Sequence, residues 1–107
     1  MSNEIAYQEP WYSVADSEIG TKLSAQLIKE IGIKHPLHTK KFKTVARRHD
    51  RDDLLVELDN DNNRFAVVHL TYAPTPAEDG SWPKVEFYKT AEDFTVKRLL
   101  PDIQEFK

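Results

Sequence analysis

The spacing of apolar residues changes twice along the chain, from every fourth residue to every second residue and back again. The first spacing forms one apolar stripe, which predicts a helix over about residues 14–31. The stripe consists of Ile19, Leu23, Leu27 and Ile31, with Ile28 beside them. We expect Ser13 or Asp16 to cap the start of this helix. Gly32, which tolerates the left-handed conformation, is expected to end it.

Alternating apolar and polar residues then predict four strands. They are expected at residues 42–47, 54–58, 65–72 and 85–88. The run of Asp and Asn at 59–63 predicts a reverse turn, because these side chains bond their own backbone. The run from Phe65 to Tyr72 is apolar on both faces, as is typical of a central strand.

The region after the third strand predicts a long loop and then a second helix. Residues 73–83 contain three of the six prolines, so they are expected to form a loop. Thr90 and Asp93 match the capping box that opens a helix. The buried face of this helix is expected to contain Phe94, Leu99 and Ile103. Pro101 lacks a backbone N–H and is expected to stop or kink the helix.

The order helix, four strands, helix predicts an α+β fold. We expect a four-stranded, mainly antiparallel sheet flanked by the N-terminal and the C-terminal helix, because short links favour antiparallel neighbours. Both helices are expected to pack on one face of the sheet. Residues 1–10 lack periodicity and predict a flexible tail, and Trp11 and Tyr12 are expected to anchor the chain to the core. Residues 11–107 then form a single domain.

Composition limits the class and the location of the protein. The chain has 107 residues, of which 39% are hydrophobic and 31% are charged, and this fits one ordinary globular core. We expect a cytoplasmic protein. The chain has no apolar run of the roughly 18 residues that cross a membrane, and its first residues lack the basic end of a secretory signal. Cysteine is absent, which excludes disulfides and thiolate metal sites, and we expect no cofactor.

The net charge of −3 hides a basic segment. Residues 34–51 contain seven Lys or Arg residues and one Asp, which gives this segment a charge of +6. One interpretation is nucleic-acid binding through cations such as Arg47 and Arg48. Strand alternation, however, places Lys43 and Arg47 opposite to Arg48. We therefore favour a solvated surface whose cations pair with Glu57 and Glu86 across neighbouring strands.

Two stretches carry a resemblance to other proteins. They are Asp52-Asp53-Leu54-Leu55 and Ala66-Val67-Val68-His69-Leu70-Thr71-Tyr72, followed by the Pro-rich loop and Phe87. Over about half of its length the chain resembles a group of small, uncharacterised bacterial proteins that share these two strand patterns. In that group Tyr72 is more often Trp and the Asp/Asn turn is shorter. The resemblance implies a similar fold, and it supplies no activity.

His69 is the first candidate for chemistry. Alternation places it on the same strand face as Val67 and Thr71, where an imidazole is half-buried and needs hydrogen-bond partners. It could act as the general base of a hydrolase or of a metal-assisted enzyme. It could equally be a structural histidine that bonds Thr71, Asp52 or Asp53, and we favour this second interpretation.

Metal binding is not expected. His35, His38 and His49 lack the spacing of known metal motifs, and the first two flank a proline in a connector, which favours a surface turn. The Asp/Asn run also fails as a calcium loop, because Arg64 stands where the turn requires glycine and Leu70 where a glutamate belongs.

Trp82 is the second candidate, because an aromatic residue in a semi-rigid loop is a typical binding anchor. Its alternative is packing onto its own domain. With glycines only at positions 20, 32 and 80, a Gly-rich phosphate loop is excluded, and we do not expect an enzyme. We predict a small protein-interaction module, a binding or immunity-type partner of another protein. Its binding residues are expected among Trp82, Tyr72, His69, Arg47 and Arg48, with the sheet edge contributing.

Overall fold

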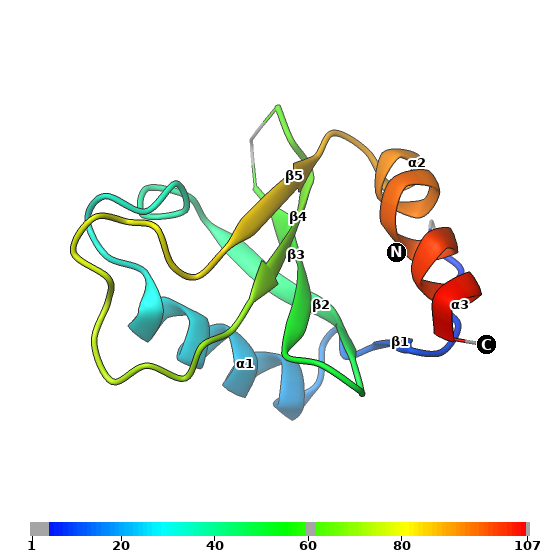
Figure 1. Cartoon of the computed structure of the whole chain (residues 1–107), viewed down its shortest axis with the longest axis horizontal. Coiled ribbons are helices and arrows are strands. Elements are labelled where there is room, and N and C mark those ends of the chain that lie inside the picture. The colour runs from blue at the N-terminus through cyan, green and yellow to red at the C-terminus, as the bar shows by residue number, and fades with distance from the viewer. Residues whose placement is uncertain (1–4, 60–61, 107) are drawn as a thin grey trace.

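The computed structural model describes residues 5–59 and 62–106, which form a sheet with helices on both of its faces (Figure 1). In chain order its elements are β1 (Trp11–Ser13), α1 (Glu18–Glu30), β2 (Phe42–Arg48), β3 (Asp53–Leu58), β4 (Phe65–His69), β5 (Val85–Tyr88), α2 (Ala91–Phe94), the π-helical η1 (Thr95–Leu99) and α3 (Leu100–Phe106). The last three elements follow one another without a break, and together they are called the C-terminal helix.

The strands form an antiparallel sheet in the order β1-β2-β3-β4-β5, so each strand pairs with its neighbour in sequence. The α+β class and the antiparallel arrangement are therefore confirmed. The predicted number of four strands is wrong for the described residues, because β1 adds a fifth. In β1, Trp11 pairs with Arg48 and Ser13 with Ala46. Three residues are too few to show an alternating pattern, and for this reason the sequence did not reveal the strand.

The two helical layers lie on opposite faces of the sheet, which corrects the expectation that both pack on one face (Figure 1). In β3, Leu54 and Val56 belong to the core under α1, whereas Leu55 belongs to the core under the C-terminal helix. Strands that are apolar on both faces need a cover on each face. The run from Phe65 to Tyr72, which is apolar on both faces, already indicated that both faces of the sheet are covered.

Helix α1 is shorter than predicted, and its buried stripe is rotated. It begins after Ser17, whose hydroxyl accepts a hydrogen bond of 3.0 Å from the N–H of Gly20, so neither Ser13 nor Asp16 is the cap. Its buried residues are Gly20, Leu23, Leu27 and Glu30. Ile28, predicted to lie at the stripe, is 63% exposed. A Cβ at Gly20 would lie 2.4 Å from the carbonyl oxygen of Val14, so glycine permits the close packing that sets this rotation.

Gly32 does not adopt the left-handed conformation expected of it. The helix ends instead at Ile31, which has a φ of −86° and donates its N–H to the carbonyl oxygen of Ile28. A Cβ at Gly32 would lie 2.9 Å from the Cβ of Pro76. Glycine is therefore required here by the close approach of the loop 73–83, and not by a left-handed cap.

A β-bulge in β2 changes which cations share a face. The register shifts between Thr44 and Ala46. As a result Lys43 lies opposite Glu57, on the face of the C-terminal helix, while Arg47 lies opposite Leu54 on the face of α1. Arg48 reaches the C-terminal helix. The expectation that Lys43 faces away from Arg48 is therefore wrong, because a bulge inserts one residue into the alternation.

Strand β4 lies between β3 and β5, which confirms its interior position, but it ends at His69 and not at Tyr72. Tyr72 has a φ of 57°, so the chain turns there. At the other end of β4, the N–H of Leu58 donates to the carbonyl oxygen of Arg64 at 2.8 Å. The predicted Asp/Asn turn includes residues 60–61, which lie outside the described residues.

The capping box before the C-terminal helix is confirmed: Thr90 Oγ1 accepts from the N–H of Asp93 at 3.0 Å, and Asp93 accepts from the N–H of Lys89. The predicted buried residues Phe94, Leu99 and Ile103 are also confirmed. The helix does not stop at Pro101 but continues to Phe106. The π-helical turn of η1 ends at Leu99, two residues before the proline, so the regular α-helical pattern is already interrupted there.

The predicted tail falls partly outside the described residues, because these begin at residue 5. Ile5 and Tyr7 pack against the core under the C-terminal helix. Contacts with the core therefore begin before the expected boundary at Trp11. Within the described residues, the structure has no helix that is both long and apolar enough to cross a membrane.

Candidate functional site

A network of polar side chains lies between the sheet and the C-terminal helix, and every strand contributes to it. We call it the Arg98 network. Its members are Trp11 of β1, Arg48 of β2, Asp53 of β3, His69 of β4, Glu86 of β5, Arg98 of η1 and Asp102 of α3, with Asp50 attached to Arg48. Because its members come from both layers, it fixes the position of the helix over the sheet.

Arg98 is the centre of this network. Its guanidinium donates to Asp53 Oδ2 at 2.6 Å, to Asp102 Oδ2 at 2.8 Å and to Glu86 Oε1 at 3.1 Å. Burial opposes the charge of Arg98, but Asp102 and Asp53 outweigh this effect, so the pKa of Arg98 is raised above its ordinary value. Tyr88, which donates to Glu86, has its pKa raised to about 12 by burial and by the charge of Glu86.

Arg48 closes the buried end of the network. It is 1% exposed, and it donates two hydrogen bonds of 2.9 Å to Asp50. Its Nη1 lies 3.1 Å from Asp102 Oδ2, which is an ion-pair distance, but Nη1 forms no hydrogen bond among the described residues. The same Asp102 oxygen accepts from Trp11 Nε1 at 2.8 Å. Arg48, one of the expected binding residues, therefore has almost no surface to offer to a partner.

His69 is, beside Glu86, one of the two members of the network with a largely exposed side chain. Its Nδ1 lies 2.7 Å from Asp53 Oδ1, while the other oxygen of Asp53 is occupied by Arg98. The expected contact with Asp53 is confirmed, whereas Thr71 donates its hydroxyl to Glu30 instead. The side chain of His69 is 49% exposed, and its Nε2 has no partner among the described residues. With Nδ1 held by a carboxylate, Nε2 is available to a molecule that binds from outside.

Trp82 is partly exposed on the Pro-rich loop, and it does not pack fully onto its own domain. The residue is 44% exposed, and its ring lies under the ammonium group of Lys84, which is 5.3 Å from the ring centroid. The peptide bond between Trp82 and Pro83 is cis. The loop runs beside the connector that follows α1, at the left of Figure 1.

The connector fixes the end of the loop that carries Trp82. His35 is buried, which corrects the expectation of a surface turn, and its Nε2 lies 2.7 Å from the carbonyl oxygen of Pro83. Because a carbonyl can only accept, Nε2 carries the proton, and Nδ1 accepts from the N–H of Leu37 at 3.0 Å. Gly80 has a φ of 76°, and a Cβ there would lie 2.4 Å from the carbonyl oxygen of Lys34. The loop and the connector are therefore in direct backbone contact.

Glu30 fixes the other end of the loop. Its carboxylate accepts from the N–H and the hydroxyl of Thr71 at 2.8 and 2.7 Å, from the N–H of Tyr72 at 2.9 Å and from Gln26 at 2.9 Å. Burial raises the pKa of Glu30, but these hydrogen bonds outweigh burial and hold it below its ordinary value. A charged residue three positions after Leu27, within a buried stripe, was the sequence signal for this role, and we missed it.

The pairing of β4 with β5 brings His69 close to the loop. The N–H of His69 donates to the carbonyl oxygen of Lys84 at 3.0 Å, so these residues lie opposite each other at the end of the two strands. Lys84 in turn covers Trp82. We call His69, Lys84 and Trp82 the Trp82 surface. Lys84 was missed in the sequence, because its position opposite His69 depends on the strand register.

The other candidate residues do not join this surface through any contact of the described residues. Tyr72 is exposed at the start of the loop, where Glu30 holds its backbone. Arg47 lies on the opposite face of the sheet, and its buried Nε has no hydrogen-bond partner in the part of the chain that the structure describes. Of the five expected residues, His69 and Trp82 thus lie on the Trp82 surface, Arg48 is linked to His69 only through the buried part of the Arg98 network, and Tyr72 and Arg47 lie apart.

Two cations of the basic segment, Arg48 and Arg51, pair with other carboxylates than expected. Glu57 accepts from Arg64, and Glu86 pairs with Arg98, so neither forms the expected pair with residues 34–51. Arg48 pairs with Asp50 and Asp102, and Arg51 lies 3.7 Å from Glu105. Arg48 and Arg51 therefore lie on the side of the C-terminal helix, whereas Arg47 lies on the face of α1, and these three cations do not form one row.

The histidines of the basic segment are not arranged as metal ligands. His49 lies 3.6 Å from Glu9 and packs edge-on against Phe106. Over residues 5–59 and 62–106, no three side chains of His, Asp or Glu come together in a way that could hold a metal ion.

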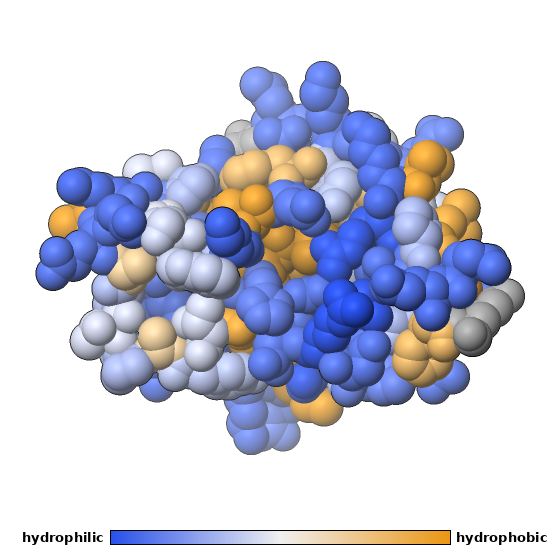
Figure 2. Space-filling model, in the orientation of Figure 1, coloured by the Kyte–Doolittle hydropathy of each residue, from blue (hydrophilic) through white to orange (hydrophobic). Residues whose placement is uncertain are grey.

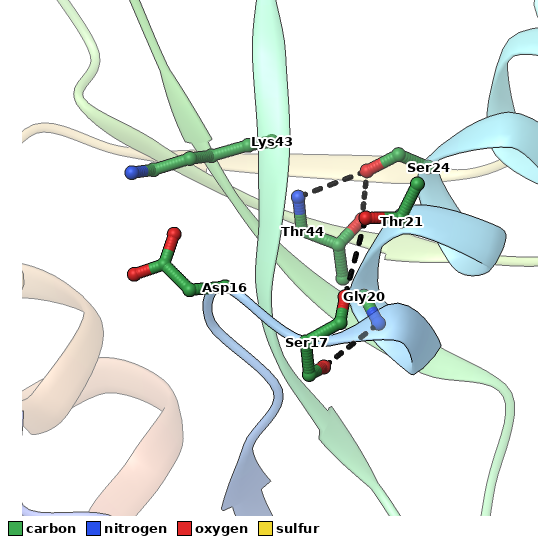
Figure 3. Close-up of a pocket in the computed structure, with 7 residues that line it drawn as sticks. All are labelled: Asp16, Ser17, Gly20, Thr21, Ser24, Lys43 and Thr44. Carbon is green, nitrogen blue, oxygen red and sulfur yellow. Dashed lines mark hydrogen bonds between the residues drawn. The ribbon is translucent and has the colours of Figure 1, made fainter.

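A polar hollow of about 110 Å³ lies where α1 begins beside β2 (Figure 3). It is lined by Asp16, Ser17, Gly20, Thr21, Ser24, Lys43 and Thr44. The hydroxyls of Ser24 and Thr44 are 2.8 Å apart, and Ser24 also accepts from the N–H of Thr44 at 3.1 Å. These contacts fix α1 to β2. The hydroxyls bond to each other, and this favours a structural role.

Comparisons of the chain with protein-family models, with curated proteins and with solved structures find no match. The resemblance to small bacterial proteins stays a prediction, and function has to be argued from the geometry. On the face shown in Figure 2, apolar residues form small groups that polar residues separate. A protein that binds this face would contact small, separate apolar groups and no broad apolar area.

Proposed function

We propose that this protein is a small protein-interaction module that binds another protein through the Trp82 surface, as a binding or immunity-type partner. The observation that carries the proposal is a partly exposed tryptophan on an irregular loop that is fixed at both ends. Long loops of this kind usually serve binding when a rigid scaffold positions them.

The contacts that hold both ends of the loop support a binding role, because they reduce the conformational entropy that is lost when a partner docks. A partner that docks on a mobile loop has to order that loop, and this lowers the affinity. Here His35 and Glu30 already hold the loop before a partner arrives. Tryptophan is also among the residues that contribute most to binding energy at protein interfaces, because it buries a large rigid area.

The enzyme alternative centred on His69 has one observation in its favour, namely the unpartnered Nε2 beside a carboxylate-bound Nδ1. A binding role uses the same atom equally well, and it also accounts for Trp82 and for the bracing of the loop. We therefore favour the binding role. Nucleic-acid binding is disfavoured, because Arg48 is buried and Arg47 lies on the other face of the sheet.

The test compares Trp82→Ala with a matched control. The full-length wild-type chain is used to capture partners from an extract of cells that make it, and the affinity of a purified partner is then measured by calorimetry. We expect Trp82→Ala to weaken this partner by about 2 kcal/mol or more, close to thirtyfold.

Ile33→Ala is the matched control, because Ile33 is 83% exposed and lies outside the Trp82 surface. Its affinity should equal that of the wild type, and urea unfolding should show that both variants are folded. A partner that binds Trp82→Ala as tightly as the wild type would contradict the proposal.

A further inference from the structure

We infer that the partner presents a carboxylate to Lys84 and His69 while an adjacent apolar group covers Trp82, so that an acidic segment of a protein is the ligand. This inference rests on the proposed function and names the chemistry of the partner. It depends on the Trp82 surface having two nitrogen groups without a partner, beside one aromatic ring.

Lys84 supplies the permanent positive charge. Its ammonium lies over the ring of Trp82 at 5.3 Å, and no carboxylate of the described residues lies within ion-pair distance of it. The ring attracts the ammonium group and so limits its motion. The cation is therefore held in place at the edge of the apolar anchor, and it has no counter-ion there.

His69 supplies the second group. It lies opposite Lys84 across the pairing of β4 with β5, and side chains directly opposite on antiparallel strands have Cβ atoms about 5 Å apart. Nδ1 is held by Asp53, so the imidazole is oriented and its Nε2 has no partner among the described residues. Because Nδ1 donates to Asp53, Nε2 can donate to a ligand when the ring carries both protons, and in that form one carboxylate can contact both the ammonium group of Lys84 and the Nε2–H of His69.

Three carboxylates of the neighbouring strands and of the loop, those of Glu86, Asp53 and Asp79, are already engaged. Glu86, two residues after Lys84, pairs with Arg98 and accepts from Tyr88. Asp53 bonds both His69 and Arg98. In the loop, Asp79 accepts from the hydroxyl and the N–H of Ser81. Lys84 is thus the charge without a counter-ion, and an anionic group of the partner complements it.

A protein carboxylate fits this surface better than a nucleic acid does. A phosphate backbone is bound by several cations in a row. The Trp82 surface offers one lysine and one histidine. The nearby arginines, Arg48 and Arg98, are both engaged in the Arg98 network.

The test uses two short peptides that differ in one group, acetyl-Leu-Glu-Val-amide and acetyl-Leu-Gln-Val-amide, added to the full-length protein and followed by NMR. We expect the glutamate peptide to shift the indole N–H of Trp82 and the ring protons of His69 in a saturable way. The glutamine peptide should bind at least threefold more weakly. Equal affinities, or no shifts at millimolar peptide, would overturn the inference.

Charge variants identify the groups responsible. Lys84→Gln and His69→Gln should each weaken the glutamate peptide at least twofold, whereas Lys29→Gln, an exposed lysine on α1, should leave it unchanged. A single-stranded oligonucleotide that binds more tightly than the peptide, with strong salt dependence, would overturn the inference in favour of nucleic acid.

The same variants separate this inference from the proposed function. Suppose that the captured partner no longer binds Trp82→Ala but binds Lys84→Gln and His69→Gln like the wild type. The proposed function is then supported, and the inference of an acidic partner is wrong. If Trp82→Ala also has no effect, the proposed function fails as well.

Discussion

Arg98 shows how much of this fold depends on a single side chain. It lies on the C-terminal helix, and its guanidinium donates hydrogen bonds to Asp53 of β3 and to Asp102 of α3 at the same time. Removing one partner of a buried ion pair costs more than the pair contributes, because the remaining charge is left without compensation. The C-terminal helix therefore depends on this residue more than on any exposed charge around it.

We expect Arg98→Met to lower the free energy of unfolding by about 3–5 kcal/mol, since the buried Asp53 loses its arginine partner and the buried Asp102 keeps only Arg48 as a cation. Urea unfolding measures this change. The neighbouring Lys97→Met is the control, because Lys97 is exposed and pairs only with Asp93, and its effect should stay within about 0.5 kcal/mol. Equal effects of the two variants would show that the network does not stabilise the fold.

The contact between His69 and Asp53 was predictable, and the role of Arg98 was not. Strand alternation and the short connection between β3 and β4 place these two residues on one face of the sheet, at the same end. Arg98 depends on the rotation of the C-terminal helix, which the π-helical turn of η1 changes. The pattern of apolar residues does not predict a π-helical turn.

At the scale of elements, periodicity located the segments but not their details. The residues of α1 follow the expected spacing, yet the buried face turned toward Gly20 and Glu30 because the backbone approaches closely there. The bulge in β2 and the short strand β1 were also beyond the sequence pattern. Each of these depends on a tertiary contact between segments that lie apart in the chain, which local spacing does not record.

Glu30 joins two elements, α1 and the chain that leaves β4, and it gives this junction a dependence on pH. Its pKa is lowered in the folded chain below the ordinary value of 4.5, so the charged form is stabilised by folding. The contribution to stability is therefore fully present above pH 4.5 and is lost as the pH falls through the lowered pKa.

We expect Glu30→Gln to lose about 1.5–3 kcal/mol of stability at neutral pH, because hydrogen bonds to a charged acceptor are removed. The difference from the wild type should shrink in acid, where the wild type also loses the charge. Urea unfolding as a function of pH measures both. Glu78→Gln, an exposed loop residue, serves as the control. A difference that stays constant down to low pH would show that the charge of Glu30 is not responsible.

At the scale of the whole molecule, the two layers and the network leave few places for a partner. Both edges of the sheet are short: β1 has three residues and β5 has four, and Lys84 and Lys89 flank β5. Short edges with lysines resist pairing with another strand. The expected contribution of the sheet edge therefore finds less support than the side chains of the Trp82 surface.

The loop 73–83 is irregular, yet binding through a pre-positioned Trp82 requires the loop to be as rigid as the sheet. Backbone ¹⁵N relaxation tests this directly, because it reports motion on the fast timescale for each residue. We predict order parameters of about 0.8 or more for residues 77–82, close to those of β4. Values below about 0.6 in the loop, with a rigid β4, would contradict the claim that Trp82 is held in place for a partner.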